Sequence, residues 1–125
     1  MKKLLLITII LLLKSFPSFG EWKELGSTSE GVHFIEKDTI RKNKELTYFN
    51  GLTDFFEPNI ESSLSSIYRS VINCKSKKFR IIRMVNYLDS MGKGKIVFEF
   101  TFEVKKMIEF EEGGNYKLFY KYICK

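Results

Sequence analysis

The stretch "NYKLFYKYICK", residues 115–125, combines a helical pattern with a cysteine one residue from the end of the chain. Large apolar residues recur at the spacing i, i+3, i+4 and i+7, which places them on one face of an α-helix: Tyr116, Phe119, Tyr120 and Ile123. Asn115 is a favourable N-cap for this helix. Aromatic residues also suit β-strands, so a final strand is the alternative. A helix with such a stripe needs an apolar surface on which to pack.

The state of the terminal cysteine depends on the compartment, and the first 20 residues have the pattern of a secretory signal peptide. Two lysines precede an apolar run at residues 4–13, and small residues stand before a cleavage site ahead of Glu21. A helix of ten residues would rise only about 15 Å, half of the hydrocarbon thickness of a bilayer, so we expect no transmembrane segment. A buried N-terminal helix is the alternative. We expect residues 1–20 to be removed and residues 21–125 to form a single domain.

Removal of the leader changes the charge of the chain. Residues 1–20 contain three lysines and no acidic residue, so 21 basic and 15 acidic residues become 18 and 15, and the net charge falls from +6 to about +3. That balance does not indicate binding to nucleic acid. No cysteine lies near the cleavage site to accept a lipid anchor. We therefore expect a periplasmic or secreted protein, with display on the cell surface as a further alternative.

Export determines how the two cysteines should be interpreted. Cys74 and Cys124 are the only cysteines of the chain, and two cysteines in a small exported domain are typical of a disulfide. A metal site or a catalytic thiol would need further ligands or a base, and the only histidine is His33. We therefore expect no metal and no cofactor. Closing a loop of about 50 residues would add about 4 kcal/mol of stability and tie the tail to the domain.

The most regular strand pattern is "IVFEFTFEV", residues 96–104. Its apolar and mixed positions alternate strictly, which is typical of an antiparallel strand with one face on a core and one in solvent. We expect the core face to carry Ile96, Phe98, Phe100, Phe102 and Val104.

Further strands are expected at 21–26, 32–37 and 46–56. Gly51, inside the last of these, indicates a bulge or a close approach to the backbone. Residues 66–74 and 78–88 flank the polar turn "CKSKK" and predict a hairpin. The predicted fold class is α+β: an antiparallel sheet of about five to six strands, with one C-terminal helix packed on it and tied by a disulfide.

The most prominent candidate ligand surface is a basic group near the predicted hairpin turn. It consists of Lys75, Lys77, Lys78, Arg80 and Arg83. This group could bind a protein or an acidic glycan by charge. Alternatively, these residues keep a hairpin tip hydrated and discourage pairing at a sheet edge.

No arrangement of residues indicates catalysis. His33 is not associated with a nucleophile by any motif, so we expect a structural role. The carboxylates Glu109, Glu111 and Glu112 lack the spacing of a calcium loop and indicate a hydrated turn. "GKGK" at 92–95 lacks the features of a phosphate-binding loop and indicates a turn. The aromatic residues of segment 46–56 could form a patch for a protein partner, but core packing fits most of them better.

The layout of the chain resembles that of the bacterial surface-adhesin protein E family. The residues that carry the resemblance are Trp22, the run "S..Y..V.NCK.KKFR", the "MGKG" that follows it, and Cys124. The resemblance implies a small exported domain in which a sheet and a C-terminal helix are joined by a disulfide. It also implies adhesion to host matrix or plasma proteins such as vitronectin and laminin, without enzymatic activity. The alternative is a periplasmic accessory or inhibitor protein of the cell envelope that has no host ligand, because a fold does not fix a function.

Overall fold

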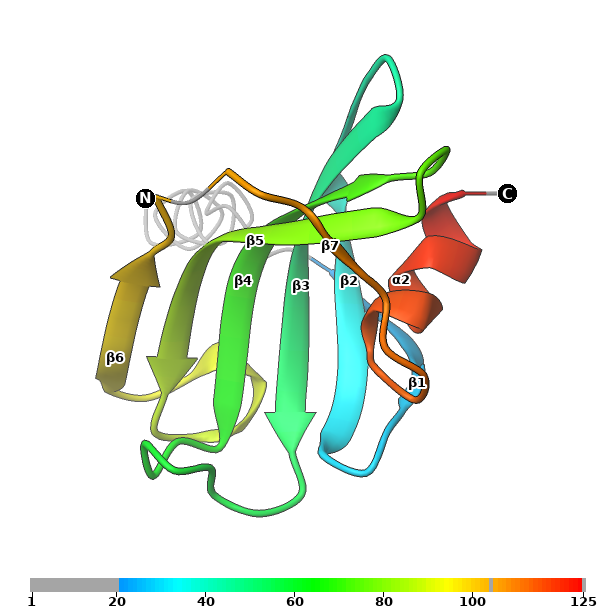
Figure 1. Ribbon diagram of the computed structural model, residues 1–125. Helices are drawn as coiled ribbons and strands as arrows, with labels where there is room; N and C mark the ends of the chain where they lie inside the picture. Colours follow the sequence, from blue (N-terminus) through cyan, green and yellow to red (C-terminus); the bar gives the residue numbers. More distant parts are fainter. Residues whose placement is uncertain (1–20, 104, 125) are drawn as a thin grey trace, which may run out of the picture.

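The structure is a computed structural model that describes residues 21–103 and 105–124. Within these residues, six strands form an antiparallel sheet in which each strand pairs with the next one along the chain, and a short seventh strand pairs with the fifth (Figure 1). The elements are β1 (Trp22–Ser27), β2 (Gly31–Asn43), β3 (Leu46–Phe55), β4 (Ser65–Asn73), β5 (Lys78–Tyr87), the 3₁₀ turn η1 (Ser90–Gly92), β6 (Ile96–Thr101), β7 (Ile108–Glu109) and helix α2 (Tyr116–Ile123). The predicted α+β class is confirmed. The predicted signal peptide lies outside the described residues.

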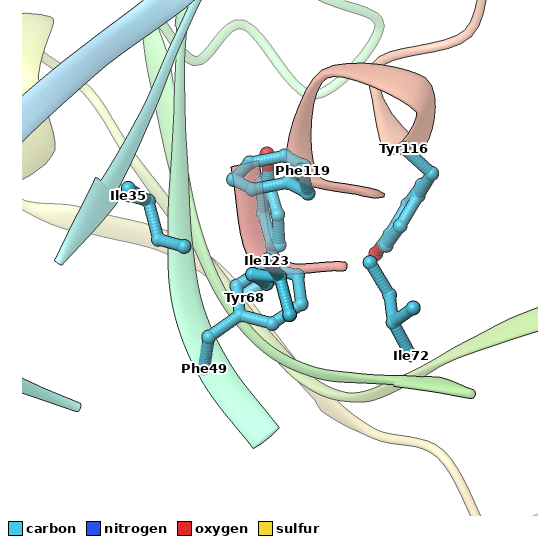
Figure 2. Close-up of a cluster of buried hydrophobic side chains, with 7 residues drawn as sticks. All are labelled: Ile35, Phe49, Tyr68, Ile72, Tyr116, Phe119 and Ile123. Atoms are coloured by element: carbon cyan, nitrogen blue, oxygen red, sulfur yellow. The ribbon is translucent and has the colours of Figure 1, made fainter. Parts of the chain in front are cut away.

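Helix α2 packs on one face of the sheet through the predicted apolar stripe. Tyr116, Phe119 and Ile123 are buried, and the ring of Phe119 stacks on that of Phe49 from β3 at 4.8 Å between centroids. Figure 2 shows this cluster, whose buried members are Ile35, Phe49, Tyr68, Ile72, Tyr116, Phe119 and Ile123. The helix is thus stabilised mainly by burial of its aromatic face, since eight residues are too few for a stable isolated helix.

Gly51 allows the sheet and the helix to approach each other closely. A Cβ atom at this position would lie 2.4 Å from Cε2 of Tyr68 and 3.0 Å from Cζ of Phe119. The predicted close approach is therefore confirmed, and it brings the backbone of β3 against two aromatic rings.

Asn115 does not cap the helix in the expected way. It has helical backbone angles, and its side chain makes no capping hydrogen bond. Instead, its amide donates to the hydroxyl of Tyr68 on β4 at 3.1 Å. Asn115 therefore connects the first turn of the helix to the sheet.

The predicted core face of residues 96–104 is wrong. Residues 96–101 do form a strand, β6, but every residue of it is exposed, with Phe98 at 38% and Phe100 at 46%. An eight-residue helix is only about 12 Å long, whereas six strands span about 24 Å. The helix lies beside β1 and β2, on the side of the sheet away from β6 (Figure 1). Of the other two expected core residues, Phe102 is half-buried and Val104 lies outside the described residues.

The opposite face of the sheet has a smaller apolar layer. Leu52, Val71 and Val85 are buried there, and the turn containing η1 folds over the end of this layer that includes Leu52. Gly92 has a φ of 70° and packs so closely that a Cβ would lie 2.5 Å from Cδ1 of Ile67. The prediction that "GKGK" forms a turn is confirmed. None of the helices in the described part of the chain is long and apolar enough to cross a membrane.

Candidate functional site

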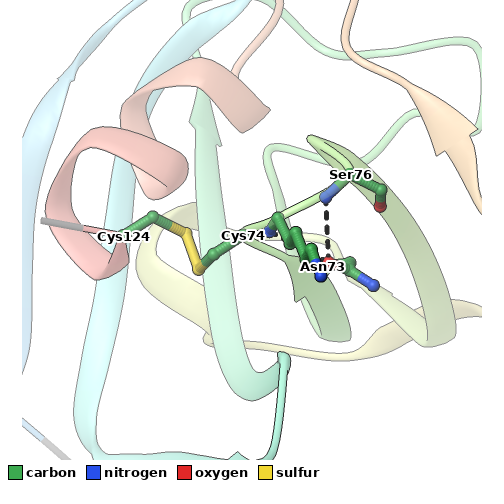
Figure 3. Close-up of a disulfide and its surroundings, with 5 residues drawn as sticks. Asn73, Cys74, Ser76 and Cys124 are labelled. Atoms are coloured by element: carbon green, nitrogen blue, oxygen red, sulfur yellow. Dashed lines mark hydrogen bonds between the residues drawn. A yellow bond between two sulfur atoms is a disulfide. The ribbon is translucent and has the colours of Figure 1, made fainter.

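The turn between β4 and β5 is organised by one asparagine side chain. Oδ1 of Asn73 accepts hydrogen bonds from the backbone N–H groups of Lys75 and Ser76, both at 3.0 Å (Figure 3). The N–H of Lys77 donates to the carbonyl of Asn73 at 2.9 Å, and Lys77 has a positive φ of 58°. These bonds fix the tip of the hairpin in one conformation.

A disulfide fastens the same tip to the end of the helix. Cys74 and Cys124 are bonded, with their Cα atoms 5.5 Å apart, as predicted (Figure 3). The bond joins the residue directly after β4 to the residue directly after α2. The hairpin tip is therefore tied covalently to the helix.

The turn between β2 and β3 lies next to this tip. Nζ of Lys75 is 3.5 Å from the carboxylate of Glu45, and the N–H of Cys74 donates to the carbonyl of Glu45 at 3.3 Å. Together with the end of α2, the two turns enclose a shallow depression of about 300 Å³, in which the charged residues are Lys42, Lys44, Glu45 and Lys75. Three lysines and one carboxylate leave an excess of positive charge there, and we call this surface the lysine depression.

The structure divides the predicted basic group between two places. Lys75 and Lys77 are exposed at the hairpin tip. Phe79 packs on the core, so its neighbours Lys78 and Arg80 point to the opposite face of the sheet.

Arg83 also lies on the opposite face, since Met84, its neighbour after the bulge, packs on the core. Its guanidinium forms an ion pair with Glu99 of β6. The five predicted residues therefore do not form one continuous site.

Lys42 and Lys44 were not predicted as site residues, although the sequence contained a signal. They lie in "RKNKE", which reads as a polar turn with an excess of basic residues. Nothing in the sequence indicated that this turn would lie beside the turn at Lys75, because the pairing of β3 with β4 brings them together.

His33 is fully buried and has partners on both ring nitrogens. Nε2 lies 2.7 Å from the hydroxyl of Thr28, and Nδ1 lies 2.9 Å from the hydroxyl of Thr53. Burial lowers the pKa of His33 from 6.5 to about 4, so the ring is neutral at pH 7. A buried, neutral and fully bonded imidazole fits the expected structural role.

The acidic segment near the end of the chain is exposed, but Glu109 lies in strand β7 and not in the expected turn. Glu109, Glu111 and Glu112 are exposed, and Glu112 pairs with Lys117 at 3.3 Å. Among the described residues, no three His, Cys, Asp or Glu side chains are grouped closely enough to hold a metal ion.

Comparison with known proteins gives one family. The family model described as "Surface-adhesin protein E" matches residues 22–125, which include every element described above. No curated protein matches the chain closely enough to be counted as a relative.

Solved structures of Haemophilus influenzae protein E share the fold. One, from non-typeable Haemophilus influenzae, is 13% identical, with a TM-score of 0.54 over 88% of this chain and 78% of that one. A second has the same identity and TM-score over 88% and 87% of the two chains. A third, crystal form II, is 14% identical, with a TM-score of 0.53 over 74% and 79%. At this identity the likeness concerns the fold alone.

Proposed function

Because the chain belongs to the surface-adhesin protein E family, we propose that it is a non-enzymatic binding module that adheres to an acidic protein or glycan of a host. The observation that carries the proposal is the lysine depression formed by Lys42, Lys44 and Lys75 between two hairpin tips. Lys75 remains accessible although it pairs with Glu45, with 81% of its side chain exposed.

The geometry of the lysine depression supports binding without a large conformational cost. The disulfide and the bonds of Asn73 already fix the hairpin tip, so a ligand does not have to order this part of the backbone. The lysine side chains themselves are long and exposed, which suits a ligand with distributed negative charge more than a single bidentate anion. A sulfated glycan or an acidic protein segment has this property.

Adhesion also requires export. We infer that residues 1–20 act as a signal peptide and that residues 21–125 form the exported domain. The disulfide supports this inference, since such bonds persist in oxidising compartments.

The test is binding to immobilised heparin, vitronectin and laminin by the purified protein with its disulfide intact. We expect binding to at least one of them, weakening as salt rises, because the attraction between exposed charges is screened. The triple variant Lys42→Glu/Lys44→Glu/Lys75→Glu should lose at least about tenfold in affinity, a loss of roughly 1.4 kcal/mol.

A matched control carries the same change in charge elsewhere. Lys93→Glu/Lys95→Glu/Lys121→Glu replaces three exposed lysines that lie outside the lysine depression. If both triple variants lose affinity equally, net charge rather than this surface determines binding. The single variant Arg83→Gln should bind normally, since Arg83 does not line the lysine depression. Absence of binding to all three ligands would contradict the adhesin proposal.

A further inference from the structure

A second, larger cavity lies at the other end of the sheet, away from the disulfide. Its volume is about 950 Å³, and it opens between the turn before β2, the loop after β3 and the start of α2. The floor is the uncovered part of the same sheet face on which the helix packs. Tyr68 on the floor and Tyr116 on the helix mark the boundary between the cavity and the core.

Two buried polar atoms in the floor have no hydrogen-bond partner. They are Oγ of Ser66 and Oδ1 of Asn86, in residues that are each only 3% exposed. The two residues pair directly across β4 and β5, and both line the cavity. A buried polar atom without a partner costs about 1–3 kcal/mol, so two of them side by side indicate a place where a ligand supplies the missing bonds.

The neighbouring polar groups do not share this defect. The hydroxyls of Tyr68 and Thr53 lie 2.9 Å apart, Tyr68 accepts from Asn115, and Thr53 is bonded to His33. Ser70, two residues further along β4, is bonded to the hydroxyl of Tyr116 at 2.8 Å. The unsatisfied atoms are therefore confined to the part of the floor that faces the cavity.

Apolar residues surround the polar floor. Ile81 and Met84 of β5 and Phe55 of β3 line the cavity. The register places Phe98 of β6 opposite Asn86, and Phe100 opposite Met84, so the exposed rings continue the same face. A contiguous apolar surface of this kind at the edge of a cavity is typical of a binding site.

The charge of the cavity selects among ligands. Glu30 and Glu57 line it, and none of the described residues around it is basic. An anionic ligand would be repelled there. A lysine or arginine side chain on a ligand would be attracted.

We propose that this cavity binds a peptide segment of a partner protein, with an apolar side chain against Met84 and Ile81, a peptide group on Ser66 and Asn86, and a basic side chain facing Glu30 and Glu57. A peptide group supplies both an N–H donor and a C=O acceptor. The N–H can donate to Oδ1 of Asn86, and the C=O can accept from the hydroxyl of Ser66. An acyl chain offers no donor to these atoms, and a neutral sugar offers no cation to the two carboxylates.

The first test is a titration of the isotope-labelled protein with three end-capped tetrapeptides, followed by backbone amide resonances. The probe has the sequence lysine–leucine–phenylalanine–lysine. In one control glutamates replace the lysines, and in the other serines replace the two apolar residues. We expect the probe to bind with a Kd of about 1 mM or lower and to shift the resonances of Ser66, Asn86 and Asn115, and both controls to bind at least about tenfold more weakly.

The second test separates a binding role from a structural one. Ser66→Ala and Asn86→Leu each remove an unpartnered polar atom, so we expect a Tm that is unchanged or higher, together with at least fivefold weaker binding of the probe. Ser70→Ala is the matched control. It breaks the hydrogen bond to Tyr116 and should therefore lower the Tm, but Ser70 does not line the cavity, so the lining residues stay the same.

Three outcomes would overturn the proposal. One is that the probe does not bind, or shifts only the resonances around Lys75. Another is that the glutamate or serine peptide binds as well as the probe does. The third is that Ser66→Ala lowers the Tm as Ser70→Ala does and leaves the affinity unchanged, which would give Ser66 a structural role. None of these results depends on whether the lysine depression binds host ligands.

Discussion

His33 shows how one buried residue makes stability depend on pH. Its ring is enclosed between Thr28 and Thr53, and its pKa is lowered to about 4 by burial, against 6.5 when unfolded. Between these two values the unfolded state binds more protons than the folded state, so stability rises with pH through this window and is lost as pH falls.

We expect the free energy of unfolding to fall by on the order of 3 kcal/mol from this group between pH 6.5 and pH 4. Urea unfolding at a series of pH values measures the effect. Since the chain has a single histidine, the ring proton signals also report its pKa directly. His33→Gln should remove this part of the pH dependence while the part due to carboxylates stays. A titration with a midpoint near 6.5 in the folded protein would contradict the prediction.

At the scale of elements, the structure assigns core packing to the helix rather than to β6. Phe119 of α2 is completely buried, whereas Phe100 of β6 is 46% exposed. Replacing each phenylalanine by alanine should therefore lower the free energy of unfolding by very different amounts. We expect Phe119→Ala to lower the free energy of unfolding by about 3–5 kcal/mol and Phe100→Ala by about 1 kcal/mol. Chemical denaturation of both variants measures the difference, and equal costs would place β6 in the core.

The disulfide holds the last element in place. It closes a loop with a sequence separation of 50, which corresponds to about 4 kcal/mol in the chain-entropy model. We expect Cys74→Ser/Cys124→Ser to lower the free energy of unfolding by roughly that amount. Reductant should destabilise the natural protein to the same level and leave the double variant unchanged. A double variant as stable as the oxidised protein would show that packing of the aromatic stripe alone holds the helix.

Local patterns predicted most of the elements, though not β7 or the full length of β2, and they did not predict which surfaces the elements bury. The spacing of Tyr116, Phe119 and Ile123 predicted a helix with a buried stripe, and two cysteines in a chain expected to be exported predicted the disulfide that holds it. The alternation in residues 96–104 predicted a strand equally well. Its burial could not be predicted, because burial depends on how much of the sheet an eight-residue helix covers, and this is a property of the assembled layers.

The candidate sites depend still more on the whole molecule. Lys75 could be singled out from its own segment, but the lysine depression exists only because strand pairing brings Lys42 and Lys44 beside it. Ser66 and Asn86 carry no sequence signal of their own, since a polar residue in a strand usually indicates only a face toward water. What makes them notable is that they are buried opposite each other without partners.

The two sites lie at opposite ends of the molecule. β3 begins at the lysine depression and ends at the cavity, and its ten residues span about 30 Å at roughly 3.4 Å per residue. Helix α2, only about 12 Å long, runs in the reverse direction between the two sites, from Asn115 beside the cavity to Cys124 at the disulfide. At physiological salt, charges are screened over about 8 Å, so direct electrostatic coupling between the ends is negligible.

We therefore expect the two binding events to be independent. The triple lysine variant should bind the basic tetrapeptide with an affinity within about twofold of the natural protein, and Ser66→Ala should bind heparin equally normally. The combined variant should bind both ligands more weakly. For each ligand, its change in binding free energy should equal the sum of the changes measured in the two separate variants, as is usual for sites more than about 10 Å apart. Calorimetric titration of the four proteins with each ligand measures this. A coupling larger than about 0.5 kcal/mol would require that the helix, fixed to the sheet at both of its ends by Asn115 and the disulfide, moves when either ligand binds.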